Sequence, residues 1–252
     1  MGLNWLLLRG LVREQRHWGD FPARLAAAGG QVLTLDLPGV GTESGRASPT
    51  NISAIVEDIR ARFVGRPGEW GIFAPSLGGM IALDWVSRHP EDFRAAVVCN
   101  TSASDLAGPF ERFSWAAVGT VLRGLVVWNP VERERLILEL VSNTDGGRAH
   151  AEEFAGFTPR IGVGVLVRQL WAGSRAKAPS SLSVPLTVLC SEGDRLCSPM
   201  ASRRLSERLN ARLEVHPSAG HDLPLDDPEW VIARVLGAGD ACAHAPSWGN
   251  RG

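Results

Sequence analysis

The chain has 252 residues and a formal net charge of -1, with 44% of its residues hydrophobic and 21% charged. This balance is ordinary for a soluble globular protein, and it gives no charge-based case for nucleic acid or an anionic membrane as a partner. The length suits one α/β domain with an insertion, or two small domains. Four cysteines without metal-ligand spacing are expected to be free thiols in a reducing compartment: Cys99, Cys190, Cys197 and Cys242.

Short apolar runs of strand length recur along the chain, beginning with Trp5-Leu6-Leu7-Leu8. This first run is too short for a transmembrane helix and no small-residue cleavage site follows it, so we expect a buried strand of a cytoplasmic protein. Most runs are continuously apolar rather than alternating, which is typical of parallel strands buried on both faces. The predicted strands are Asn4–Leu8, Gln31–Leu35, Glu69–Phe73, Ala95–Asn100, Leu186–Cys190 and Arg212–Val215.

Segments with helical periodicity separate these strands. Ser48-Pro49-Thr50-Asn51 is a helix start signal, and the apolar residues that follow it fall on one helical stripe. The alternation of strands and helices predicts an α/β fold, with a mostly parallel, twisted sheet of about six strands and helices on both faces. The predicted helices are Trp18–Ala28, 52–63, Met80–Arg88, Ser198–Asn210 and Asp227–Leu236.

The alternation stops between about Ser102 and Ser183, where the sequence predicts helices only. Asn129-Pro130 opens one helix and Thr158-Pro159 another, with Asp145-Gly146-Gly147 as a loop between them. Such helices would form a cap over the sheet edge where ligands bind in open α/β folds. The predicted division is an α/β core of residues 1–101 and 184–238, a helical cap of residues 102–183, and a mobile Gly-, Ala- and Pro-rich tail of residues 239–252.

The run from Gly71 to Met80, GIFAPSLGGM, is the most informative stretch of the chain. A strand-like segment ends at Ser76 and a helix-like segment follows at once. This turn exposes the serine hydroxyl above a helix N-terminus, which offers unpaired N–H groups to a developing anion. Small residues are needed two before and two after the serine, because strand and helix come into near contact, and Ala74 and Gly78 supply them.

A serine nucleophile needs a base within hydrogen-bond reach, and the base needs an orienting carboxylate. The predicted strand Leu186–Cys190 runs into a loop that carries Asp194. The next strand, Arg212–Val215, runs into a loop that carries His221. Both side chains would then lie with Ser76 beyond the C-terminal ends of parallel strands, in the chain order serine, aspartate, histidine.

Other polar residues have simpler interpretations. Three other aspartates are alternatives to Asp194 as the orienting acid. Asp227 is expected to cap a helix, and Asp226 is its neighbour. Asp222 adjoins His221 in sequence, so it points poorly for the required contact. Asp36 is expected to stabilise the turn at Pro38-Gly39. The remaining histidines lack a post-strand Gly-His context and are interpreted as structural, with His17 the nearest to the proposed site: His17, His89, His150, His216 and His244. The cap aromatics are expected mostly to pack helices, with two or three reaching a substrate: Phe110, Phe113, Trp115, Trp128, Phe154, Phe157 and Trp171.

Taken together, these motifs resemble those of the α/β-hydrolase fold superfamily, over roughly residues 4–236. The resemblance implies Ser76 as nucleophile, His221 as general base and Asp194 as its carboxylate. It also implies an oxyanion hole formed by the backbone N–H groups of Leu77 and Leu11. The matching runs are Leu8-Arg9-Gly10-Leu11, Asp36-Leu37-Pro38-Gly39-Val40-Gly41, Ala74-Pro75-Ser76-Leu77-Gly78-Gly79, Glu192-Gly193-Asp194 and Gly220-His221.

The sequence departs from the family pattern at three positions near the site. Arg9 stands where members commonly have histidine, and it would bring a fixed charge to the site or pair with a carboxylate. Ala74 replaces the usual first glycine of the elbow. Pro75 precedes the nucleophile and lacks an N–H, which suits the end of a strand but removes a donor.

The resemblance implies a carboxylesterase-like serine hydrolase that cleaves a small-molecule ester through an acyl-enzyme, without cofactor or metal. Thioesterase, acyltransferase, lactonase and C–C bond hydrolase reactions use the same triad and stay open as alternatives. A non-catalytic scaffold that binds a ligand or partner is the alternative of a different class. A serine nucleophile disfavours the aspartate-dependent dehalogenase and epoxide hydrolase chemistries of this fold. The sequence does not predict the oligomeric state.

Overall fold

The computed structural model describes residues 2–157 and 162–243. In these residues, six parallel strands form one sheet in the order β2-β1-β3-β4-β5-β6, which confirms the predicted α/β fold. Each strand lies within two residues of its predicted bounds. The strands are β1 (Asn4–Leu8), β2 (Val32–Leu35), β3 (Trp70–Pro75), β4 (Ala95–Cys99), β5 (Leu186–Ser191) and β6 (Arg212–His216).

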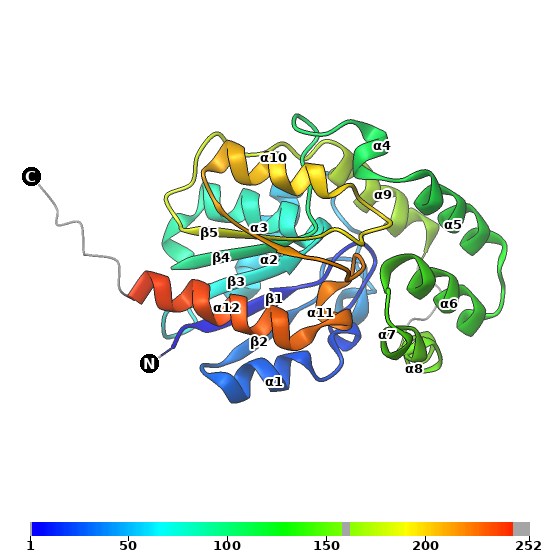
Figure 1. The fold of residues 1–252 in the computed structure, drawn as a ribbon, viewed down its shortest axis with the longest axis horizontal. Coiled ribbons are helices and arrows are strands. Elements are labelled where there is room, and N and C mark those ends of the chain that lie inside the picture. Colours follow the sequence, from blue (N-terminus) through cyan, green and yellow to red (C-terminus); the bar gives the residue numbers. More distant parts are fainter. Residues whose placement is uncertain (1, 158–161, 244–252) are drawn as a thin grey trace, which may run out of the picture.

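Helices cover both faces of the sheet, and Figure 1 shows α10 and α12 on opposite sides of it. These helices are α1 (Phe21–Ala28), α2 (Ile52–Phe63), α3 (Leu77–Arg88), α10 (Pro199–Leu209) and α12 (Pro228–Ala243). Shorter elements connect them: η1 (Gln15–Trp18), η2 (Gly41–Glu43), η3 (Pro90–Asp92) and α11 (Leu223–Asp226). In the described residues, no helix is both long and apolar enough to cross a membrane.

Successive side chains of β1 enter two different hydrophobic cores. Leu6 and Leu8 pack in the core that contains buried residues of α2, α3 and α10. Trp5 and Leu7 pack in the core that contains buried residues of α1 and α12. Because side chains alternate across a strand and both faces are covered, the strand sequence is apolar at every position.

Two helix ends differ from the sequence prediction. The first helix starts at Phe21 rather than Trp18, with Pro22 in its first turn, and η1 precedes it. The last helix continues to Ala243 rather than ending at Leu236, so residues 239–243, which were predicted to belong to a mobile tail, are helical. Glycine weakens a helix interior, but Ala238 packs on the core and Gly239 lies close to Trp5, so tertiary contacts outweigh propensity. Residues 244–252 lie outside the described part of the chain.

Between β4 and β5 the described residues form helices and connecting loops only, and Figure 1 shows these helices gathered beyond one end of the sheet. The predicted loop Asp145-Gly146-Gly147 is wrong, because these residues open a short helix whose cap, Thr144 Oγ1, accepts from Gly147 N–H at 2.9 Å. The predicted start at Thr158-Pro159 lies outside the described residues. The helices are α4 (Pro109–Arg112), α5 (Trp115–Val126), α6 (Pro130–Val141), α7 (Asp145–Ala149), α8 (Ala151–Phe157) and α9 (Val163–Ser174).

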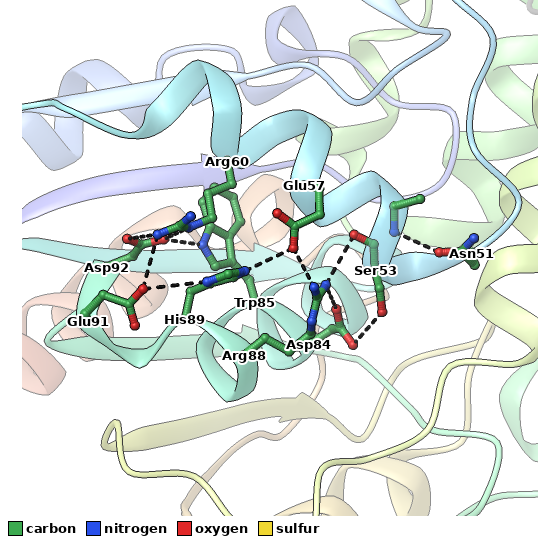
Figure 2. Close-up of polar contacts among 11 residues, drawn as sticks. Asn51, Ser53, Glu57, Arg60, Asp84, Trp85, Arg88, His89, Glu91 and Asp92 are labelled. Carbon is green, nitrogen blue, oxygen red and sulfur yellow. Dashed lines mark hydrogen bonds and ion pairs between the residues drawn. The ribbon is translucent and has the colours of Figure 1, made fainter.

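Helix α3, which follows Ser76, is tied to α2 by a network of polar side chains (Figure 2). Asp92 accepts hydrogen bonds from Arg60 Nε at 2.6 Å and from Trp85 Nε1 at 2.8 Å. Arg88 at the end of α3 donates to Glu57 of α2 at 2.6 Å. These contacts fix α3 along the sheet, and with it the position of the turn at its N-terminus.

Candidate active site

Ser76 lies at the turn between β3 and α3, in a backbone conformation that non-glycine residues rarely adopt. Its φ is 55° and its ψ is -123°. Its N–H donates to Cys99 O at 2.8 Å, and its carbonyl accepts from Thr101 Oγ1 at 2.8 Å, so neighbouring β4 and the loop after it hold this strained turn. Ser76 is the N-cap residue of α3, but its hydroxyl makes no capping hydrogen bond.

Small residues allow the backbone to pack closely around this serine. A Cβ on Gly78 would lie 2.7 Å from the carbonyl oxygen of Arg9 and 2.8 Å from that of Leu8. A Cβ on Gly10 would lie 3.1 Å from Cβ of Ser76. The requirement for a small residue two positions after the serine is therefore confirmed, since α3 approaches β1 backbone to backbone.

The structure brings Asp194 and His221 together, although 27 residues separate them in sequence. His221 Nδ1 and Asp194 Oδ2 are 2.7 Å apart, and the two side chains are 8% and 2% exposed. The second carboxylate oxygen of Asp194 accepts from the N–H groups of Leu196 and Cys197 at 2.7 and 2.9 Å. These backbone bonds fix the carboxylate, which in turn orients the imidazole ring.

Two opposing influences act on the pKa of His221. Burial is the larger single influence and lowers the pKa, since it disfavours the imidazolium. The negative charge of Asp194 and its hydrogen bond, with a further contribution from Asp222, outweigh burial. The pKa of His221 is therefore raised above its ordinary value.

The three rival aspartates are engaged elsewhere. Asp222 forms a two-point ion pair with Arg9, at 3.1 Å for the Nη1–Oδ1 contact. Asp227 caps α12 by accepting from Trp230 N–H at 3.0 Å, as predicted. Asp226 accepts from Gly220 N–H at 2.6 Å. Within the described residues, Asp194 is the aspartate that meets the His221 ring.

Ser76 and His221 line the same cavity, which has a volume of about 390 Å³. Its remaining wall is mostly apolar and comes from the loop after β1 and from α5, α6 and α9. Asp194 is not among the lining residues, in keeping with its burial behind His221. Residues of the apolar wall include Leu11, Leu125, Ile137, Leu140 and Leu166.

The seven aromatic residues of the helical segment mostly follow the prediction. Phe113 and Trp128 line the cavity, and Phe154 is buried against α6. Phe113 and Phe157 pack against the same cluster as Phe154, and Phe110 of α4 stacks on Trp115 of α5 with ring centroids 4.5 Å apart. Most of the seven therefore pack between helices as expected, although four of them are at least half exposed. These are Phe110 at 62%, Trp115 at 70%, Trp128 at 77% and Trp171 at 50%.

The two predicted oxyanion donors lie on the two turns that meet at Ser76. Leu77 is the first residue of α3, where N–H groups have no partner within the helix. Leu11 follows Gly10, which touches Ser76, and Leu11 itself lines the cavity. The ion pair of Arg9 with Asp222 ties this loop to the residue after His221, which fulfils the expectation that Arg9 pairs with a carboxylate.

Three polar residues that support the site were missed in the sequence. Asn100 donates to His221 O at 2.9 Å and accepts from Ser191 N–H at 2.9 Å, which joins the ends of β4 and β5 to the histidine loop. Asn143 donates to the carbonyls of Gly193 and Ser218, both at 2.9 Å. Asp226 was considered as a rival acid and as the neighbour of a cap, but not as a residue that supports the site. Asn100 follows a strand, which was an available signal; nothing local marks Asn143.

One group of side chains in the described residues is close enough to hold a metal ion. Ligand atoms of Asp194, Cys197 and His221 all lie within 4.8 Å of one another. Burial raises the pKa of the Cys197 thiol well above its usual range, which disfavours the thiolate that a metal requires. The thiol instead donates to Arg112 O at 2.9 Å. This chemistry favours hydrogen bonding over metal binding.

Comparisons with known proteins agree with this architecture. A search of curated proteins finds no match. Among solved structures, the chain is similar to a non-heme bromoperoxidase-like protein of Mycobacterium tuberculosis, with a TM-score of 0.79 and 20% identity over 96% of this chain and 93% of the other. It is also similar to a thermophilic esterase of Thermogutta terrifontis, with a TM-score of 0.74 and 19% identity over 96% and 91%. An enol-lactonase of Burkholderia xenovorans gives 0.74 and 17% over 94% and 91%.

At 17–20% identity, the similar structures establish the fold alone. The family is established by a comparison of the sequence with a family model. Residues 5–228 match the family described as serine aminopeptidase, S33. That match includes all of the sheet except the first residue of β1, and the residues around Ser76, Asp194 and His221. The chain therefore belongs to the S33 serine aminopeptidase family of hydrolases, within the α/β-hydrolase superfamily.

Proposed function

We propose that this chain is a serine hydrolase that cleaves carboxylic esters with an apolar acyl group. One observation carries the proposal: Ser76, on a strained elbow, opens into the same apolar cavity as His221, whose ring is hydrogen-bonded to buried Asp194. A nucleophile, a base and an orienting acid in this order are what acyl transfer requires. A cavity of about 390 Å³ suits a small or medium-sized ester.

The proposed reaction has two steps. His221 accepts the proton of the Ser76 hydroxyl as its oxygen attacks the ester carbonyl, and the N–H groups of Leu77 and Leu11 stabilise the oxyanion. The imidazolium then gives that proton to the departing alcohol, leaving an acyl-enzyme. In the second step His221 takes a proton from water as the water oxygen attacks the acyl carbon. The imidazolium then returns that proton to Ser76 Oγ as the acyl–oxygen bond breaks, which releases the acid and regenerates the serine.

The charges in the cavity favour an ester over a peptide with a free amino terminus. Binding an ammonium group calls for an unpaired carboxylate. The acidic residues that line the cavity in the described chain are Glu134 and Asp222, and each forms an ion pair with an arginine, Arg13 or Arg9. The esterase and lactonase functions of two structural neighbours also support an ester or lactone substrate.

The proposal is tested by the hydrolysis of p-nitrophenyl esters of graded acyl length, together with labelling by a fluorophosphonate. We expect turnover by the wild type, its loss in Ser76→Ala, and wild-type rates in a control, Ser181→Ala, at an exposed serine. Loss of the nucleophile should reduce the rate by about 10⁶-fold. A wild-type protein that neither turns over any ester nor becomes labelled at Ser76 would point to the non-catalytic scaffold. Activity on thioesters alone would point to a thioesterase.

A further inference from the structure

The loop after β1 forms a tight turn beside Ser76 in an unfavourable backbone conformation. Arg13 N–H donates to Gly10 O at 3.3 Å, which closes a four-residue turn. Val12, its third residue, has a φ of 50°, whereas Leu11 at the second position has a negative φ. These signs place the turn in the type II class, whose third residue is ordinarily glycine or asparagine. A β-branched residue at that position is strained, so other contacts must hold the turn.

Two helices from the segment between β4 and β5 contact this turn. Gln169 of α9 accepts a hydrogen bond from Val12 N–H through Oε1, at 2.8 Å, across 157 residues of sequence. Glu134 of α6 forms an ion pair with the neighbouring Arg13 at 2.5 Å. Gln169 is fully buried and Glu134 is 5% exposed, so neither contact is a solvent-facing one.

The bond to Gln169 acts on the part of the turn that decides its type. Type I and type II turns differ by rotation of the peptide between their second and third residues. Here that peptide joins Leu11 to Val12, and its N–H is the group that Gln169 accepts. Rotation to the type I form would relieve the strain at Val12, but it would break this hydrogen bond.

The rest of the Gln169 side chain argues against a role in stability alone. Its Nε2 is buried and has no hydrogen-bond partner among the described residues. A buried donor without a partner destabilises a fold, and an apolar side chain of the same shape avoids that cost. The amide is therefore a poor choice for packing and a good one for holding a peptide in a fixed orientation.

We propose that Gln169 is a positioning residue for the oxyanion hole. By holding the Leu11–Val12 peptide, it fixes the type II conformation of the turn and with it the position of Leu11, whose own N–H, on the preceding peptide, is the predicted oxyanion donor. The inference rests on the proposed hydrolase function. Gln169 lies on α9 and Glu134, which pairs with Arg13, lies on α6. The conformation of the turn after β1 therefore depends on how α6 and α9 pack against the core.

Replacing Gln169 by methionine removes the acceptor at similar volume. We expect kcat for p-nitrophenyl butyrate to fall by roughly 10- to 100-fold, because loss of one whole oxyanion donor costs about 10²–10³. KM should change by less than about 2-fold and the melting temperature should not fall, since an unpaired buried donor is removed as well. Gln169→Glu, which keeps an acceptor oxygen, should recover most of kcat. Arg168→Met, at an exposed position of the same helix, is the control. Wild-type kcat in Gln169→Met would overturn the proposal.

A second substitution separates turn conformation from general damage. Glycine adopts positive φ without strain, so Val12→Gly should hold the turn without help from Gln169. In the Val12→Gly background, Gln169→Met should lower kcat by less than about 3-fold. Equal losses of kcat in both backgrounds would show that Gln169 does not act through the Val12 peptide.

A measurement that needs no substrate separates this proposal from the hydrolase proposal. Exchange of the Val12 amide hydrogen, followed by ¹H–¹⁵N NMR on the full chain, should be slow in the wild type and at least about 10-fold faster in Gln169→Met. Unchanged exchange would refute the assigned hydrogen bond whatever the activity. If exchange is faster in Gln169→Met but the wild type hydrolyses no ester, the hydrogen bond from Val12 to Gln169 stands. The hydrolase proposal is then the one that is refuted.

Discussion

His221 lies near two aspartates that have different partners: Asp222 pairs with Arg9, and Asp194 pairs with His221 itself. Burial would raise the pKa of Asp222, but the adjacent Arg9 guanidinium outweighs burial and lowers it. Asp222 therefore stays ionised and engaged with Arg9, while Asp194 meets the imidazole directly. The same local arrangement keeps the pKa of His221 above its ordinary value.

The raised pKa of His221 predicts the pH dependence of the reaction. The base must be neutral to accept a proton, so kcat/KM should rise with pH through a midpoint above 6.5. In Asp194→Asn the charge that raises this pKa is removed, so the midpoint should move to lower pH while kcat falls by roughly 10⁴-fold. The check is a pH–rate profile of both proteins with an NMR titration of the imidazole. A midpoint that stays in place or moves up in Asp194→Asn would contradict the assignment.

The three candidate residues, Ser76, Asp194 and His221, could be predicted from the sequence because each follows a recognisable strand. The residues that support this candidate site could not be predicted, since their partners are distant in sequence. Asp226 binds Ser142 across 84 residues, and Gln169 reaches Val12 across 157. A glutamine inside an amphipathic helix carries no local sign that its amide faces a strained turn.

The strands of the core could be predicted from their own residues, whereas helix α7 and the end of helix α12 depend on contacts with other parts of the chain. Every predicted strand appears, because continuous apolar runs are typical of strands that are covered on both faces. The glycines of α7 and of the end of α12 indicated a loop and a tail. A Thr144 cap and packing against the core made both segments helical instead.

The polar network between α2 and α3 gives a prediction at the level of elements (Figure 2). Asp92→Ala removes the acceptor of Trp85 Nε1 and Arg60 Nε. It should lower the free energy of unfolding by about 1–3 kcal/mol, because Trp85 is buried and its N–H loses its partner. Glu91→Ala is the control, since Glu91 also pairs with Arg60 but is 63% exposed, and its loss should cost less than about 1 kcal/mol. Denaturant titration measures both. Equal losses would show that the network acts as a surface ion pair only.

At the scale of the whole molecule, the core and the helical segment share a buried interface around His17. Its ring lies 5.0 Å from that of Phe154 and 5.9 Å from that of Phe157, centroid to centroid, both on α8. Burial, with the positive charges of Arg13 and Arg9, lowers the pKa of His17 to about 2. His17 is therefore part of the packing between the two parts, as the structural interpretation of this residue predicted.

This lowered pKa makes the interface sensitive to acid. The unfolded chain binds a proton at His17 below about pH 6.5, whereas the folded chain does not do so until about pH 2, so acidification favours unfolding. Between pH 6.5 and 5, the free energy of unfolding should fall by up to about 1.4 kcal/mol per pH unit more in the wild type than in His17→Phe, which keeps an aromatic ring. Urea titrations across this range test it. Parallel pH profiles would show that His17 is protonated in the folded protein.

By itself, the sequence determined the parallel sheet, the family and the positions of a serine, an acid and a base, because apolar runs and strand-end motifs are local features. Only the tertiary structure decided that Arg9 is neutralised by Asp222, and that α6 and α9 contact the turn beside Ser76. The physical reason is that charges and hydrogen bonds act over a few ångströms in space. The chain brings these groups together only after the sheet and its helices have packed.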